Sequence, residues 1–110
     1  MNTSAATAEQ ALAQILRSIV WEQIPASHVA FTGSDPALRT NFLVGTAGAA
    51  AIAAAGLAAA HLWELRTGRR QDVAMDVARG AMVMRGNLYT QLLGKPRPPT
   101  WDVISGLYQT

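Results

Sequence analysis

The stretch of sequence that decides the fold runs from Phe42 to Gly68 and reads FLVGTAGAAAIAAAGLAAAHLWELRTG. Almost every residue of 47–66 favours a helix, and alanine favours it most. Thr46 is available as the helix N-cap, and Gly68 stands where a left-handed residue commonly follows a helix. The stretch therefore predicts one long helix over about residues 47–66. Because this helix is apolar nearly all round, it is expected to be buried in a protein or in a bilayer.

The same stretch is long enough to cross a membrane, since ~20 apolar residues span a hydrocarbon core of ~30 Å. Its composition argues against insertion, because alanine contributes little and His61 and Glu64 lie in the last turns. Arginines also flank both ends, so the orientation of a span would be poorly set. The sequence favours burial within a protein, and a membrane span is kept as an alternative.

The chain before this helix predicts one more helix and a loop. Apolar residues recur at helical spacing over residues 8–21, and Thr7 with Gln10 forms a capping-box pattern, so a helix is expected there. The segment 22–41 is rich in Gly, Pro, Ser, Asp and Thr. It predicts a loop with at most a short strand around Val29–Phe31.

The chain after the long helix predicts a strand, a third helix and a connector. Apolar and polar residues alternate over 72–77, which is typical of a short strand. An amphipathic helix is expected over residues 78–93, although its glycines weaken it. Residues 94–100 form a proline-rich connector, and residues 101–110 read as the start of another element. The expected fold class is mainly α, with three helices and one or two short strands.

Composition excludes several classes of function. The chain has 110 residues, which fits one domain or part of one. Its formal charge of +2 falls short of the clustered basic surface of a nucleic-acid-binding protein, so no such partner is expected. It has no cysteine, which excludes disulfides and zinc–thiolate sites, and no metal site is expected. The N-terminus lacks the basic region of a secretory signal, so residues 1–6 are interpreted as a disordered tail of a cytoplasmic protein.

Three arginines surround the end of the long helix. Arg66, Arg69 and Arg70 lie on both sides of Gly68 in a chain that is otherwise poor in charge. Cations near a helix C-terminus interact favourably with the helix macrodipole, by about 0.3–1 kcal/mol each when exposed. These arginines therefore either cap the helix in solvent or form an anion-facing turn, for example toward the phosphates of a cofactor.

Three motifs together resemble a known family. The corner ELRTGRRQDVAMDV (64–77), followed by a helix that opens ARGAMV, resembles the family III CoA-transferases, also called the CaiB/BaiF family. That family includes formyl-CoA transferase and alpha-methylacyl-CoA racemase. FTGSDP (31–36) and WDVISGLYQT (101–110) resemble motifs that precede the helix and close the segment in a subset of the family. The residues that match the corner are Gly68, Arg69, Gln71, Val73, Met75 and Val77, while Arg70 stands where glycine is usual.

The resemblance implies a CoA-transferase that lacks its catalytic residue. Family members move CoA between an acyl-CoA donor and a carboxylate acceptor through an aspartate at the entrance to the long helix, and covalent catalysis splits this transfer into easier steps. Counting back from Gly68, Thr46 stands at that aspartate position. A threonine hydroxyl without an adjacent base is a poor nucleophile, so no catalytic residue is expected and Thr46 is better explained as the N-cap. The isolated chain is expected to be inactive, and Arg69 and Arg70 are the candidates for contacting the phosphates of CoA.

The two histidines have no expected catalytic role. His28 and Asp35 are the only candidates in the loop for the proton-transfer pair of the racemase branch, but their spacing does not match, so they are interpreted as surface or turn residues. His61 is interpreted as a core histidine. The resemblance also implies a larger α/β CoA-transferase fold, of which residues 1–110 form a single partial segment. The expected partners are acyl-CoA and either a second copy of the chain, as a homodimer, or the rest of the enzyme. The alternatives are a small single-span membrane protein and a helical interaction module.

Overall fold

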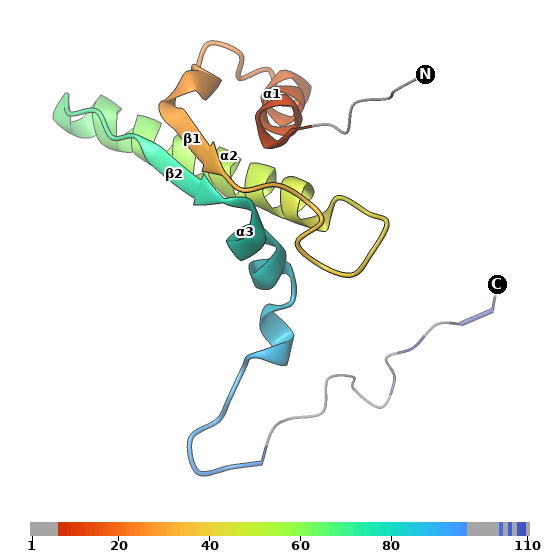
Figure 1. The fold of residues 1–110 in the computed structure, drawn as a ribbon. Coiled ribbons are helices and arrows are strands. Elements are labelled where there is room, and N and C mark those ends of the chain that lie inside the picture. The colour runs from red at the N-terminus through yellow and green to blue at the C-terminus, as the bar shows by residue number, and fades with distance from the viewer. Residues whose placement is uncertain (1–6, 97–103, 105, 107, 110) are drawn as a thin grey trace, which may run out of the picture.

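The computed structural model describes residues 7–96, 104, 106, 108 and 109. The first half of these residues forms α1 (Ala8–Ser18), the short 3-10 helix η1 (Ala26–His28) and β1 (Val29–Thr32). The second half forms α2 (Val44–Thr67), β2 (Val73–Asp76), α3 (Val77–Met84) and a second 3-10 helix, η2 (Gly86–Leu88). The described part of the chain is therefore mainly α with short strands, as the sequence predicts (Figure 1).

The two strands pair in parallel, with Val29 opposite Val73 and Thr32 opposite Asp76. Parallel neighbours cannot be joined by a tight turn, so α2 serves as the crossover of a β–α–β unit. Figure 1 shows the strands side by side with α2 running behind them. The carboxyl ends of both strands therefore lie at one edge of the sheet.

Helix α1 begins as the sequence predicts and ends earlier. The Thr7 hydroxyl accepts a hydrogen bond from the Gln10 N–H at 3.3 Å, and the Gln10 side chain accepts one from the Thr7 N–H at 3.0 Å, so the capping box is confirmed. The predicted end at residue 21 is wrong, because the chain turns out of the helix after Ser18. Val20 takes a positive φ of 58°, and the Trp21 N–H donates to the Leu16 carbonyl at 2.9 Å, which closes the last turn.

Helix α2 is longer than its predicted span of 47–66 at both ends. It begins at Val44, because two backbone amides of its first turn donate hydrogen bonds to Asp35 in the preceding loop. The predicted left-handed cap is confirmed: Gly68 has a φ of 68°, and its N–H donates to the Glu64 carbonyl at 2.8 Å. Of the helices in residues 7–96, α2 alone is long and apolar enough to cross a membrane, a property that core helices also have.

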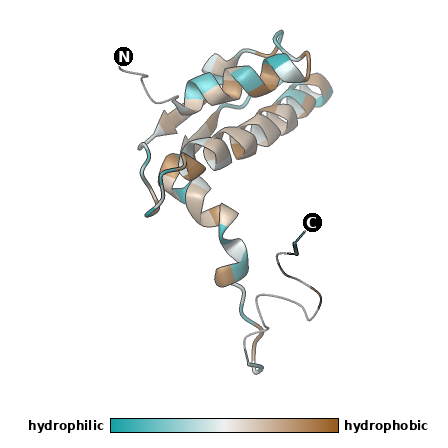
Figure 2. Ribbon diagram, turned by 90° about the vertical axis from the view of Figure 1, so that its right-hand side faces the viewer, coloured by the Kyte–Doolittle hydropathy of each residue, from teal (hydrophilic) through white to brown (hydrophobic). Residues whose placement is uncertain are grey.

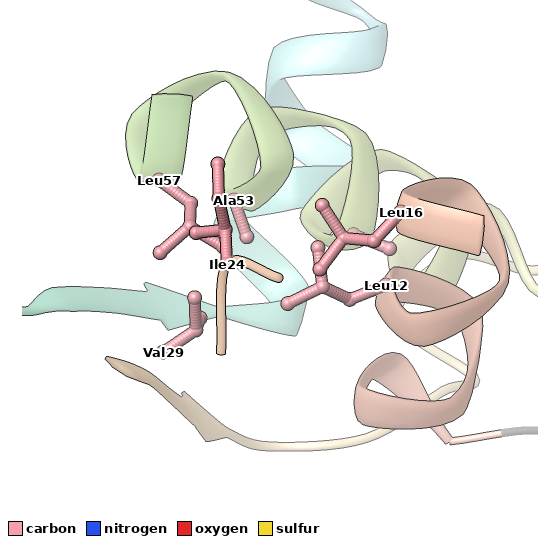
Figure 3. Packing of buried hydrophobic residues seen from close by; sticks show 7 residues of the cluster. Leu12, Leu16, Ile24, Val29, Ala53 and Leu57 are labelled. Atoms are coloured by element: carbon pink, nitrogen blue, oxygen red, sulfur yellow. The ribbon is translucent and has the colours of Figure 1, made fainter. Parts of the chain in front are cut away.

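The main hydrophobic core lies between α1, α2 and the strands. Figure 3 shows the side chains of this core pointing toward one another from these elements. Its buried residues are Leu12, Leu16, Ile24, Val29, Ala50, Ala53 and Leu57. In Figure 2, α1 alternates between hydrophilic and hydrophobic residues, whereas α2 is apolar along most of its length. The pattern follows the predicted amphipathicity of α1 and the alanine-rich composition of α2.

Helix α3 packs tightly on α2 and is shorter than the predicted helix 78–93. A methyl group added to Gly80 would lie 2.6 Å from the backbone nitrogen of Ala49, so the two backbones approach closely only because this residue is glycine. The regular helix ends at Met84, and η2 follows. Beyond Met84 the described residues are nearly all exposed, so no packing offsets the low helix propensity of Gly86 and Asn87.

Several apolar surfaces in the described part of the chain have no protein layer over them. Ala30 and Ala74, which are opposite one another in the sheet, are both exposed, although parallel sheets are usually covered on both faces. Large exposed side chains after α2 include Met82, Val83 and Leu93, with exposed fractions of 55%, 58% and 99%. The predicted tail 1–6, much of the connector 94–100 and most of 101–110 lie outside the described residues.

Candidate functional site

The loop after β1 brings an aspartate to the start of α2. Asp35 Oδ2 accepts a hydrogen bond from the backbone N–H of Thr46 at 2.6 Å, and Oδ1 accepts one from the N–H of Gly45 at 3.2 Å. Oδ1 also accepts the N–H of Ala37 at 3.1 Å, within the loop. A helix leaves the first amides of its N-terminus without partners, so Asp35 caps α2 from outside the helix.

The surroundings of Asp35 favour its charged form. Burial raises the pKa of Asp35, but hydrogen bonds from Thr46, Ala37 and Gly45 together outweigh burial and lower the pKa below its usual value. The positive end of the α2 macrodipole also favours a negative charge at this place. The Asp35 carboxylate therefore occupies the position where a helix N-terminus would otherwise bind an anion.

Thr46 is held by the same carboxylate. Its side chain is 7% exposed, and both its hydroxyl and its backbone N–H are hydrogen-bonded to Asp35. The prediction that Thr46 is the N-cap is wrong, because Leu43 precedes the helix and the capping oxygens come from Asp35. A carboxylate beside a hydroxyl can act as a general base, but one with a lowered pKa is a weak base. The geometry fixes the start of α2 and does not activate the Thr46 hydroxyl.

Glycine is required beside Thr46 at the start of α2. A methyl group on Gly45 would lie 2.6 Å from Asp35 Oδ1 and 2.8 Å from Val77 Cγ1. The missing side chain lets both the capping loop and the start of α3 reach the first turn of α2. The sequence contains this glycine, but its partners are distant in the chain and were not predicted.

The start of α3 is capped at the same edge of the sheet. Asp76 ends β2, and its Oδ1 accepts the N–H of Arg79 at 2.9 Å. Its Oδ2 accepts the Thr32 hydroxyl at 3.2 Å, which links the carboxyl ends of the two strands. Ligands of open α/β sheets bind outside these ends. Here both helix starts are already occupied by carboxylates of the chain itself.

A hollow of about 200 Å³ opens beside Asp35 and Thr46. Its apolar lining comes from Ala8, Phe31, Leu43 and Val77, and its polar lining comes from Thr7, Glu9, Ser34, Asp35 and Thr46. Two of the lining side chains are carboxylates, and none is basic. The hollow therefore disfavours phosphates and other anions.

The arginine corner lies at the other end of α2. Arg69 and Arg70 are exposed, and the Arg69 N–H donates to the Thr67 hydroxyl at 3.2 Å. At 1.5 Å per residue, α2 separates this corner from Thr46 by roughly 30 Å. Within one chain, the predicted phosphate contacts and the predicted aspartate position thus do not form a single site.

The remaining candidates are also separated. His28 immediately precedes β1 and Asp35 follows it, so the strand lies between them and they form no proton-transfer pair. The interpretation of Asp35 as a surface or turn residue missed its role as the cap of α2. His61 is half-buried on α2, not fully within the core. No sequence motif marks a cap in which the aspartate stands eleven positions before the backbone amide that it accepts.

Comparisons with known proteins leave the family open. No protein-family model, no curated protein and no solved structure matches the chain.

Proposed function

We propose that this chain is a segment of a family III CoA-transferase that contacts CoA without catalysing its transfer. The proposal is supported by where two of the family-like motifs lie in the fold. FTGSDP provides Asp35, which caps the start of α2, and the TGRR corner ends the same helix at Gly68. Motifs that resemble the family thus cap both ends of the long helix.

The proposed inactivity rests on the state of Thr46. A CoA-transferase of this kind needs a carboxylate that is free to attack a thioester carbonyl. Thr46 has no carboxylate, and its hydroxyl donates to Asp35. Both oxygens of Asp35 are engaged with backbone amides, which lowers the nucleophilicity of that carboxylate as well.

The proposed CoA contact is the arginine corner. Arg69 and Arg70 are exposed, and arginine pairs well with phosphate oxygens. The hollow beside Asp35 has the wrong charge for phosphates, so the corner is the better of the two places. Thr46 is roughly 30 Å away from this corner along α2. The acyl group of a CoA bound at the corner would therefore react with a residue of another polypeptide.

We further propose that the chain works in the cytoplasm in association with a second copy or with the rest of an enzyme. The uncovered face of the parallel sheet and the exposed Met82, Val83 and Leu93 favour association over an isolated monomer. The alternative of a single-span membrane protein rests on α2. Extraction of membranes with alkaline carbonate separates the two, since a spanning α2 would keep the chain in the pellet.

Calorimetric titration of the purified chain with CoA tests the proposed contact. Replacing both Arg69 and Arg70 by Ala is expected to weaken binding by roughly tenfold or more, as loss of charge-assisted hydrogen bonds does. Arg17→Ala is the matched control, because Arg17 is an exposed arginine in the last turn of another helix. Absence of CoA binding, or equal binding by all three proteins, would contradict the proposal.

A further inference from the structure

The last turns of α2 present large apolar side chains to solvent. Leu62, Trp63 and Leu65 have exposed fractions of 49%, 43% and 70%. Leu57 and Ala60, in the same part of the helix, are buried. One side of these turns therefore packs against the protein, and the other side exposes two leucines and a tryptophan.

The exposed apolar surface continues along α2 toward its start. Ala51, Ala55 and Ala59 are exposed and lie four residues apart, a spacing that places them on one face of a helix. Leu62 follows Ala59 by three residues and continues this face. No charged residue occurs in α2 before Glu64. A contiguous apolar surface of this kind commonly marks a contact with a protein or a membrane.

Three positive charges adjoin the apolar end of this surface. Arg66, Arg69 and Arg70 are exposed, and in the part of the chain that the structure describes none of their guanidinium groups is paired with a carboxylate. The Thr67 hydroxyl donates to the Trp63 carbonyl at 2.8 Å and accepts the Arg69 N–H at 3.2 Å. These hydrogen bonds fix the arginine corner to the helical turn that carries the tryptophan.

We propose that the exposed face of α2 and the arginine corner dock together on the surface of an anionic phospholipid membrane. Helices that lie in a membrane interface combine an apolar face of Leu and Trp with basic residues. Arginines near the surface are attracted to anionic headgroups, and tryptophan is enriched at the membrane–water interface. A soluble anion such as CoA would engage the arginines and leave the leucines exposed, whereas a lipid surface covers both.

The proposed docking differs from a membrane span. Ala50, Ala53 and Leu57 of α2 are buried in the core with side chains of α1 and β1, so a spanning α2 would have to leave that core. Only the exposed face is free to contact lipid, and α2 would lie along the membrane surface. Figure 1 shows the arginine corner at the end of α2 that lies away from α3. The inference does not rest on the proposed CoA contact, although both involve Arg69 and Arg70.

Co-sedimentation with vesicles tests the docking. The purified chain is mixed with vesicles of phosphatidylcholine alone, or of phosphatidylcholine and phosphatidylserine in equal amounts. We expect binding to be roughly tenfold tighter or more when phosphatidylserine is present, and to weaken as salt screens the arginines. Alkaline carbonate should release the bound chain, because the buried face of α2 stays in the core. Retention of the chain in carbonate would contradict surface docking.

Two double variants separate the apolar from the basic contribution. Leu62→Ala with Leu65→Ala should weaken binding to the phosphatidylserine vesicles by roughly tenfold or more, because less apolar surface leaves water. Arg69→Ala with Arg70→Ala should weaken it by a similar factor. The leucine variant should bind CoA as the wild type does in a calorimetric titration. Failure of the lipid contact and failure of the CoA contact are thus distinguishable.

Leu93→Ala and Arg17→Ala are the matched controls, because they remove an exposed leucine and an exposed arginine elsewhere in the chain. Circular dichroism checks that each variant is folded. The comparison of the two kinds of vesicle uses the wild type and is decisive without any variant. The proposal is overturned if the wild type binds neither kind of vesicle or binds both equally. A loss of binding as large in the controls as in the double variants would overturn it as well.

Discussion

Asp35 Oδ2 accepts the backbone N–H of Thr46 at 2.6 Å, so the longest helix of the chain is capped by a residue from the loop that precedes it. This contact joins β1, through its loop, to the crossover helix of the β–α–β unit. It also gives the hydroxyl at the expected catalytic position a structural partner. The first turn of α2 therefore depends on one carboxylate outside the helix.

Removing the Asp35 carboxylate is expected to destabilise the fold. Asp35→Ala leaves the amides of Gly45 and Thr46 without their acceptor, and loss of a helix cap of this kind costs about 1–2 kcal/mol. Urea unfolding followed by circular dichroism measures the change in the free energy of unfolding. Asp72→Asn, at an exposed aspartate, should change it by less than about 0.5 kcal/mol. Equal effects of the two substitutions would show that the cap contributes nothing.

The same carboxylate makes stability depend on pH in acid. Hydrogen bonds hold the pKa of Asp35 in the folded chain below its unfolded value of ~3.9. Its contribution is therefore complete above the unfolded pKa and is lost as the pH falls through the lower folded pKa. Melting temperatures measured from pH 6 down to pH 2.5 should fall more steeply for the wild type than for Asp35→Asn. Parallel curves for the two proteins would rule out this role.

Close contact between α2 and α3 predicts opposite outcomes at two glycines. Gly80→Ala forces a methyl group to within 2.6 Å of the Ala49 backbone, and overpacking of this kind costs about 1–3 kcal/mol. A methyl group added at Gly86 would have no atom within 4 Å. The free energy of unfolding of Gly86→Ala should therefore stay within about 0.5 kcal/mol of the wild type. Chemical denaturation of both variants measures the difference. A Gly80→Ala protein as stable as Gly86→Ala would mean that the helices do not pack as described.

Local sequence signals predicted the elements well. The capping box of Thr7 and Gln10, the left-handed Gly68 and the alternation over 72–77 each involve residues close in sequence, and each is found in the structure. The ends of the helices were predicted less well. Helix 78–93 was extended too far because periodicity alone does not show whether another element is present to pack against it.

The candidate site could not be assembled from the sequence. Asp35 caps α2 across a loop, and Gly80 meets Ala49 across two helices, so both contacts depend on the tertiary fold. Thr46 was predicted as the N-cap but lies within the first turn of α2, and its hydrogen-bond partner was not foreseen. His28 and His61 are far apart in the chain but line the same hollow, which likewise depends on the tertiary fold.

A CoA-exchange assay tests the central claim most directly. The purified chain is incubated with an acyl-CoA donor and a free carboxylate, and the CoA species are separated by liquid chromatography. Because Thr46 carries no carboxylate and its hydroxyl is held by Asp35, we expect the donor to be recovered without a new CoA thioester. Formation of a new thioester that disappears in Thr46→Ala would contradict it.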